Sequence, residues 1–289
     1  MNFKTVTTTD ASNLAFRNLF PAYKEDPLDY SFKLWKRLTL HSLIESINTH
    51  SPDRSIIAMD SRKNWRELIY KDYKANREAK RRSSGIDFEK FFPVANDFWL
   101  DFKETFTTFV VLEVDLCEAD DLIAVLVKNL LKDSNVINIS TDKDFYQLYL
   151  ENNYKQYHPS KREFIQVMNP KRDLEYKIID GDAGDDIPPI YEVKHKTWKR
   201  SKKVAEKVLE DLDQFVLDVS NREKYERNKT LIDFRCIPIK YQNTIKETYE
   251  SIETKPLKRN AILDFLKRHD MRDSLEDVQG FSQLLRRIS

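Results

Sequence analysis

The pattern of hydrophobic and polar positions predicts strands that alternate with helices through the first half of the chain. Short apolar runs predict strands at Phe3–Thr8, Ser55–Met59, Thr107–Val114 and Asn135–Ser140. Apolar residues at helical spacing predict helices at Tyr30–Ile47, Phe88–Phe102 and Ala119–Leu131. This alternation predicts an α/β fold, with a mainly parallel central sheet flanked by helices.

The second half of the chain has a different pattern. Beyond Pro170 no further strand alternation is present, and the chain is predicted to be mainly helical to its end. We therefore place a boundary near residue 180, between an α/β domain at 1–180 and a helical region at 181–289.

Acidic residues follow several of the predicted strands. Asp10 comes just after the first strand, Asp60 just after the second, and Asp142 and Asp144 just after the fourth. In open α/β sheets, ligands bind at the carboxyl ends of the strands. Because acids at several strand ends are unlikely to arise by chance, we expect these side chains to meet at one edge.

Each acidic segment also has a simpler explanation. The acids of segment 118–121 begin a predicted helix, and taken alone they are best explained as helix caps. Alternation would place Asp142 and Asp144 on one side of an extended segment, but a turn-forming pair of aspartates is equally compatible. The Asp- and Gly-rich segment 180–188 usually means only a loop, and its spacing fits an EF-hand poorly.

Taken together, the three segments indicate a cation site. Carboxylates packed at one edge raise one another's pKa unless a cation lies among them. Magnesium prefers oxygen ligands, so a group of aspartates suits it better than zinc or copper. Two such ions roughly 4 Å apart can activate a water and stabilise the leaving oxygen of a phosphodiester.

Two basic stretches interrupt an otherwise balanced charge, since the net charge is only +1. Segment 62–82 holds nine Lys and Arg residues against three acids, and segment 194–207 holds seven against one. Each would by default be a solvated helix face, but the first directly follows a strand end that carries an acid. We expect these stretches to grip nucleic-acid phosphates, through Arg66, Lys71, Lys196, Lys199, Arg200, Lys202 and Lys203.

Composition excludes several other classes. Only four glycines occur, and neither GxGxxG nor GxxxxGK[ST] is present, so the usual nucleotide-binding loops are missing. Cys117 and Cys236 lie far apart and support neither a disulfide framework nor a zinc site. No run of eighteen apolar residues occurs, so a protein of a reducing, cytoplasmic compartment without a membrane span is expected.

The ordered set of motifs resembles the 5′-nuclease (flap endonuclease) superfamily, most closely the ribonuclease H members of T-even bacteriophages. The matching segments run in order from residue 10 to about 235. They are Asp10–Arg17, Ala58–Asp60, Tyr73–Arg77, Glu118–Asp121, Ser140–Phe145, Gly181–Asp185 and Leu231–Phe234.

The resemblance implies roles for single residues. A helical arch near 62–86 would span the active site, and Lys74 and Arg77 would reach from it to the scissile phosphate. The first metal would lie among Asp10, Asp60, Glu118, Asp120 and Asp142. The second would lie among Asp142, Asp144, Asp182 and Asp185. The sequence departs from the family at Ile187–Lys203, where no glycine-rich helix–hairpin–helix is recognisable.

The function expected from the resemblance is a metal-dependent 5′→3′ exonuclease and flap endonuclease. It would use two Mg²⁺ ions, with Mn²⁺ as a substitute, and remove RNA primers or flaps during DNA replication, as in a phage-infected host cytoplasm. Its partners would be DNA and RNA–DNA duplexes with 5′ ends or flaps, and a replication single-strand-binding protein or sliding clamp. The chain is expected to be a monomer.

Two alternatives belong to other classes. One is a nucleic-acid-binding homologue that has lost catalysis, which the retained acids argue against. The other is a metal-dependent phosphatase of small molecules on a similar sheet. The long basic segment argues against that alternative, because a small phosphate needs no such grip.

Overall fold

The computed structural model describes residues 4–25, 29–192 and 201–271. Its centre is a six-stranded sheet in the order β3-β2-β1-β4-β5-β6. The strands are β1 (Thr5–Asp10), β2 (Arg54–Met59), β3 (Val110–Glu113), β4 (Asn135–Ile139), β5 (Tyr154–His158) and β6 (Glu163–Phe164). β1 to β5 are parallel to their neighbours, and β6 pairs antiparallel with β5. The predicted α/β class is therefore confirmed.

Strand details differ from the prediction in two ways. β1 ends at Asp10, so this carboxylate is the last residue of the strand rather than the first residue after it. β5 and β6 were not predicted, because β5 is a short segment of mixed polar and aromatic residues and β6 has only two residues. Both follow β4 and extend the sheet beyond the predicted strands.

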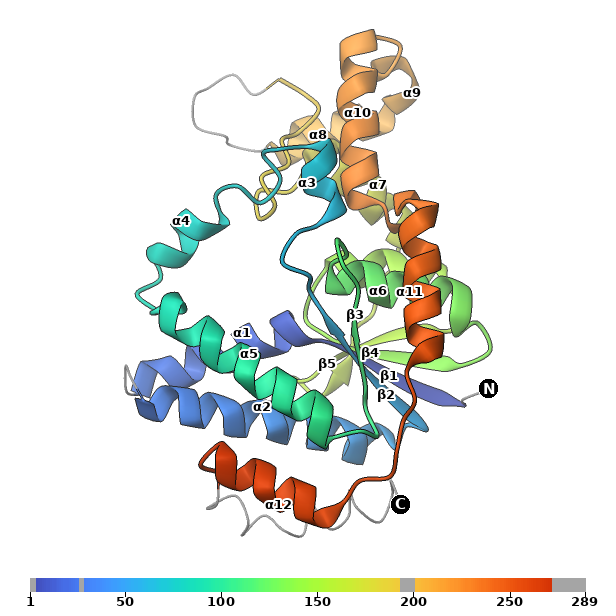
Figure 1. The fold of residues 1–289 in the computed structure, drawn as a ribbon. Coiled ribbons are helices and arrows are strands. Elements are labelled where there is room, and N and C mark those ends of the chain that lie inside the picture. Colours follow the sequence, from blue (N-terminus) through green and yellow to red (C-terminus); the bar gives the residue numbers. More distant parts are fainter. Residues whose placement is uncertain (1–3, 26–28, 193–200, 272–289) are drawn as a thin grey trace.

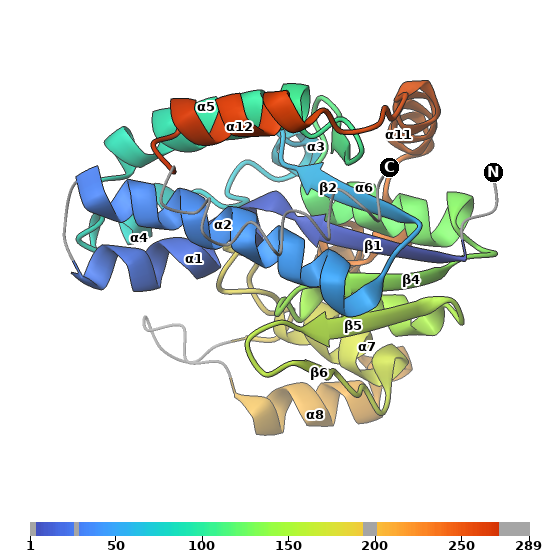
Figure 2. The same cartoon turned by 90° about the horizontal axis from the view of Figure 1, so that it is seen from below.

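Helices cover both faces of the sheet (Figure 1, Figure 2). One layer is formed by α1 (Ala11–Glu25), α2 (Asp29–His50), α5 (Phe88–Thr105) and α12 (Arg259–Arg268). Their buried side chains share one cluster that includes Trp35, Phe98 and Phe265. The other layer is formed by α6 (Ala119–Val125), its π-helical continuation Leu126–Leu130, the 3-10 helix Asp144–Leu150 and α11 (Ile239–Ser251). α1 was not predicted, and it contains Pro21, a residue that usually interrupts helices.

A third group of helices stands beyond the carboxyl edge of the sheet (Figure 1). It consists of α7 (Pro170–Asp180), α8 (Lys202–Glu210), α9 (Leu212–Phe215) and α10 (Val219–Ile232). The chain then passes through a 3-10 turn at Phe234–Cys236 and returns to the sheet in α11. The described part after residue 181 is mainly helical, and its helices α11 and α12 help to complete the two buried layers on the sheet.

The segment between β2 and α5 forms a bridge from the third helix group to the α1–α2–α5 layer (Figure 1). It holds two short helices, α3 (Trp65–Ile69) and α4 (Arg77–Arg82), joined by turns. This segment corresponds to the helical arch that was expected near 62–86. Among the described helices, none has both the length and the apolar character needed to cross a membrane.

Candidate metal centre and nucleic-acid cleft

Three neighbouring strands bring the first group of acids together. Asp10 ends β1, Asp60 follows β2 and Asp142 follows β4, and β1 is paired with both of the other strands. In the register of β1 with β2, Asp10 is paired with Ala58, which precedes Asp60 by two residues. Together with Glu118 and Asp120 from the start of α6, these acids line one open cleft of about 440 Å³. All five residues expected around a first metal therefore share a single cleft.

Burial and mutual repulsion both oppose ionisation of the acids in this group. Burial, followed by repulsion from Asp60, raises the pKa of Asp10 from its ordinary 3.8 to about 8. Burial and the charges of Asp142 and Asp10 likewise raise the pKa of Asp120. Carboxylates that resist ionisation in this way are stabilised as anions by a cation placed among them. The donor set consists of hard oxygen ligands only, which fits Mg²⁺ or Mn²⁺.

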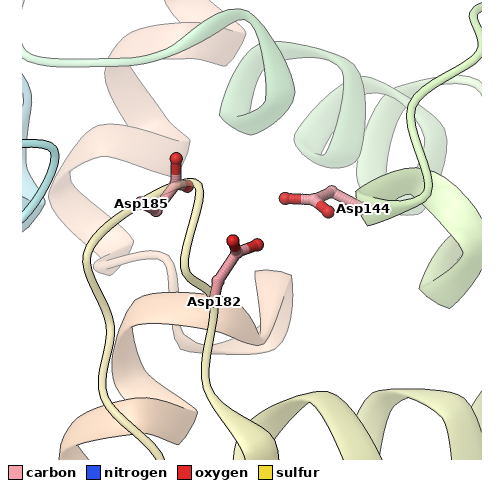
Figure 3. A group of neighbouring side chains, drawn as sticks. All are labelled: Asp144, Asp182 and Asp185. Atoms are coloured by element: carbon pink, nitrogen blue, oxygen red, sulfur yellow. The ribbon is translucent and has the colours of Figure 1, made fainter. Parts of the chain in front are cut away.

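A second group consists of Asp144, Asp182 and Asp185. One carboxylate oxygen from each lies within 4.8 Å of the others, and the three side chains point toward a common space from the 3-10 helix and from the loop after α7 (Figure 3). Burial raises the pKa of Asp144 to about 6, although Lys177 opposes the shift. This group also suits a divalent cation held by oxygen ligands.

The loop that carries Asp182 and Asp185 is closed on itself. The backbone N–H groups of Asp182 and Ile187 donate to each other's carbonyl oxygens at 2.9 and 2.8 Å. Gly181 precedes this bridge with φ of +66°, and a Cβ there would lie 2.4 Å from the Ile187 carbonyl oxygen. Only glycine fits this position. The Asp- and Gly-rich segment is thus a loop, as its composition indicated, and it presents two members of an acidic cluster.

Asp142 and Asp144 do not face the same way, which corrects one of the expectations. The Asp144 N–H donates to Asp142 Oδ1 at 2.9 Å, so the two residues form a turn instead of an extended segment. As a result Asp142 lines the first cleft, while Asp144 lies with Asp182 and Asp185 in the second group. The turn-forming alternative is correct here, and it divides the two acids between the groups.

Lys177 is a site residue that sequence reasoning missed. Its ammonium lies between the two aspartates, paired with Asp144 and 2.8 Å from Asp182. Burial lowers its pKa, but the charges of Asp144 and Asp182 outweigh burial and raise it. The only signal in the sequence is a lysine on the helix that leads into the aspartate loop, and many surface helices carry such a lysine.

Two bases of the arch, Lys74 and Arg77, lie against the acids. Lys74 is paired with Glu118, and its Nζ lies 3.7 Å from Asp185. Arg77 Nη2 lies 3.0 Å from Asp185 Oδ1. The Lys74 side chain is 14% exposed and that of Arg77 is 42% exposed, so Arg77 is the more open to an incoming phosphate. Burial opposes ionisation of Glu118, but Lys74 and Arg66 outweigh burial and lower its pKa.

Arg66 does not fit its expected role as a phosphate contact. Its side chain is only 3% exposed, and its guanidinium is paired with Asp121 at 2.7 Å and Glu118 at 3.1 Å. Sequence position placed it in the basic stretch, but α3 turns this side chain inward. Asp121 also accepts the Glu118 N–H at 3.0 Å. The capping explanation of segment 118–121 is therefore correct for Asp121, while Glu118 and Asp120 face the acidic groups.

Three of the remaining residues expected to contact phosphates lie in the part of the chain that the structure describes. Lys71 is exposed on the arch, and Lys202 and Lys203 are exposed in the first turn of α8. Lys202 Nζ lies 3.8 Å from Glu206, a weak surface pair. Lys196, Lys199 and Arg200 lie outside the described residues.

Comparisons with known proteins agree with this fold. The family described as 5′-3′ exonuclease, N-terminal resolvase-like domain, matches residues 5–177, and the chain belongs to this family of nucleases. Ribonuclease H of Enterobacteria phage T4 is 27% identical over 241 residues, which cover 76% of this chain and 78% of that protein. A 5′-3′ exonuclease of Bacillus subtilis is 22% identical over 275 residues, covering 86% and 84% of the two chains.

A solved structure shares the fold. It is the bacteriophage T5 D15 flap endonuclease in a complex with DNA and metal ions, with a TM-score of 0.64 and 20% identity. The match covers 86% of this chain and 98% of that one. The flap endonuclease architecture thus extends through most of the molecule.

Proposed function

We propose that this protein is a divalent-metal-dependent 5′→3′ exonuclease and flap endonuclease that hydrolyses phosphodiesters of DNA and RNA–DNA structures. The observation that carries the proposal is the meeting of two carboxylate groups with the arch bases Lys74 and Arg77. Glu118 and Asp120 connect the groups, since both line the first cleft and the smaller hollow beside Asp144, Asp182 and Asp185.

The carboxylates would hold two ions, Mg²⁺ in the cell and Mn²⁺ as a substitute. When bound, such ions supply a nucleophilic hydroxide at neutral pH and stabilise charge on the leaving oxygen. The first ion would be held by Asp10, Asp60, Glu118, Asp120 and Asp142, and the second by Asp144, Asp182 and Asp185. Lys177, which now neutralises two acids of the second group, would have to yield part of this contact to the ion.

Lys74 and Arg77 would act on the scissile phosphate. Both extend from the arch over the acids. When a phosphate binds at this site, each base would exchange its carboxylate partner for a phosphate oxygen. Fixed cations at this position stabilise charge that develops in the transition state. The open cleft extends beyond the acids, where it is lined by Phe16, Phe20 and Arg81. It therefore has room for a nucleotide beside the acids.

We infer the substrate class from the exposed bases and from the relatives. A duplex or flap needs contacts far from the reacting phosphate, which Lys71, Lys202 and Lys203 can supply. We propose further that the substrates are RNA primers and flaps at replication forks, and that the protein acts in the host cytoplasm. A single-strand-binding protein or a sliding clamp as partner, and a monomeric state, stay predictions.

The decisive experiment is digestion of end-labelled flap, nicked and RNA–DNA duplexes with and without Mg²⁺. Products released from the 5′ end only when metal is present would support the proposal. Binding of the same duplexes without cleavage under saturating Mg²⁺ or Mn²⁺ would instead identify a homologue that has lost catalysis.

A further inference from the structure

The loop that carries Asp182 and Asp185 also holds the middle of the arch, between α3 and α4. The Lys74 N–H donates to the Asp185 carbonyl oxygen at 3.0 Å. The Asp186 carboxylate accepts two hydrogen bonds from Asn76, one from the backbone N–H at 2.8 Å and one from the side-chain Nδ2 at 3.1 Å. Two consecutive loop residues therefore fix the backbone of the arch on either side of Ala75.

Asn76 occupies the N-cap position of α4, where an asparagine side chain ordinarily accepts a hydrogen bond from the first turn. In the described structure it makes no such capping bond. Its amide instead points to Asp186. The helix thus gives up a stabilising cap in exchange for a contact to the aspartate loop.

One residue of the arch and one residue of the aspartate loop have an unfavourable backbone conformation where the two segments meet. Lys74 has φ of +60° and Asp186 has φ of +59°, in the left-handed region that residues with a Cβ rarely adopt. Such conformations persist where surrounding contacts impose them, and they cluster at functional sites. Here the hydrogen bonds of Lys74 and Asn76 to the loop provide that constraint.

The backbone conformation of the turn at Lys74 determines the directions of the Lys74 and Arg77 side chains. With this backbone, the Lys74 ammonium reaches Glu118, and Arg77 at the start of α4 reaches Asp185. A different backbone at residues 74–76 would move both side chains relative to the acids. Displacements of about 1 Å at a reacting group can lower a rate on the order of 100-fold.

We propose that Asn76 and Asp186 are a positioning pair, which places Lys74 against Glu118 and Asp185 and Arg77 against Asp185, and so couples the arch to the loop that carries Asp182 and Asp185. The proposal rests on the proposed function, because the two bases matter only if phosphodiester cleavage occurs. Neither residue of the pair supplies a group to the reaction. Their effect passes through the two bases.

The first test uses single substitutions under single-turnover conditions. Asn76→Ala and Asp186→Ala should each lower the cleavage rate by on the order of tenfold or more. Substrate affinity should change little for Asn76→Ala, because the side chain carries no charge for the phosphates. Asp72→Ala is the matched control, since it removes a carboxylate that is exposed on the same arch.

The second test exchanges the pair. With Asn76→Asp and Asp186→Asn together, the new amide can still accept the backbone N–H and donate to the new carboxylate, so both hydrogen bonds are retained. Asn76→Asp alone places two carboxylates side by side and should be the slowest variant. The exchanged pair should recover most of the wild-type rate. A merely general stabilising role of α4 would not produce this order.

Amide hydrogen exchange separates this inference from the proposed function. The Asn76 N–H donates to the Asp186 carboxylate, so it should be protected in the wild type and lose protection in Asp186→Ala. The Lys74 N–H keeps its acceptor, the Asp185 carbonyl oxygen, and should lose protection as well only because the arch is no longer held to the loop. If wild type shows no cleavage, the proposed function fails, while the exchange result still tests the coupling. Unchanged amide protection in Asp186→Ala, or a wild-type cleavage rate in Asn76→Ala, would overturn the positioning pair.

Discussion

Arg66 donates two parallel hydrogen bonds to the Asp121 carboxylate, from Nη2 to Oδ1 at 2.7 Å and from Nη1 to Oδ2 at 2.9 Å. The Trp65 indole N–H donates to the same carboxylate at 3.0 Å. Arg66 Nε donates to the Leu231 carbonyl at the end of α10. This arginine therefore ties the start of the arch to α6 and to the third helix group.

The first prediction is that Arg66→Ala destabilises the fold. It leaves the Asp121 carboxylate, which is fully buried, without its cation, and breaking a buried pair on one side costs about 3–5 kcal/mol. Urea denaturation measures the loss, with Lys71→Ala as an exposed control that should stay within about 0.5 kcal/mol of wild type. A fully stable Arg66→Ala protein with weakened DNA binding would restore the phosphate-contact role.

The second prediction concerns the acids of the first cleft. Asp120→Asn and Asp142→Asn should each lower Mg²⁺-dependent cleavage by on the order of 100-fold or more, while folding and duplex binding survive. Because each change removes a charge from a repelling group, stability without metal should hold or rise. Either variant cutting at nearly the wild-type rate under saturating metal would contradict the two-metal assignment.

The third prediction concerns the arch bases. Lys74→Ala and Arg77→Ala should reduce the single-turnover rate by on the order of 100-fold and weaken binding far less, because fixed cations at the reacting phosphate act mainly in the transition state. Rates at saturating enzyme and equilibrium binding separate the two effects. Equal losses in both would reduce these residues to general phosphate contacts.

The fourth prediction follows from the pKa of Asp10, which burial and Asp60 raise from 3.8 to about 8. Between these values the folded protein holds a proton that the unfolded chain has released. The protonated Asp10 carboxyl therefore makes its full contribution to the free energy of unfolding below about pH 4. This contribution is lost as the pH rises through about 8. Thermal melts in EDTA should show falling stability over this range. Asp10→Asn should flatten the dependence, and so should Mg²⁺, because the cation takes the place of the proton.

The fifth prediction concerns the second basic stretch. Neutralising Lys199, Arg200, Lys202 and Lys203 together should weaken duplex binding for all sequences and leave the chemical step at saturating enzyme nearly unchanged. The slope of log affinity against log salt should flatten by roughly 0.9 for each phosphate that is no longer neutralised. An unchanged salt slope in the quadruple variant would leave only a solvated helix face.

The sequence by itself determined the class of fold and the residues around which the site is built. A continuous apolar run marks a strand that is buried on both faces, and apolar residues at helical spacing mark the buried face of a helix. β2, β4 and α5 were therefore predicted nearly to their ends. Parallel strands deliver their following residues to one edge, so Asp10, Asp60 and Asp142 could be expected to meet there. The short β5 and β6 lack such a pattern. The Pro-containing α1 was missed although its buried residues, such as Leu14, Ala15 and Leu19, recur at helical spacing.

Only the tertiary structure decided which charged residues belong to the site and which support the fold. Arg66 and Lys74 lie in one basic stretch, yet the first is buried against Asp121 and the second reaches Glu118 and Asp185. Lys177 enters the second acidic group only because α7 packs beside the 3-10 helix that begins at Asp144. Local sequence fixes the direction of a side chain within its own element. The partner it meets depends on how distant elements pack, and no local pattern contains that information.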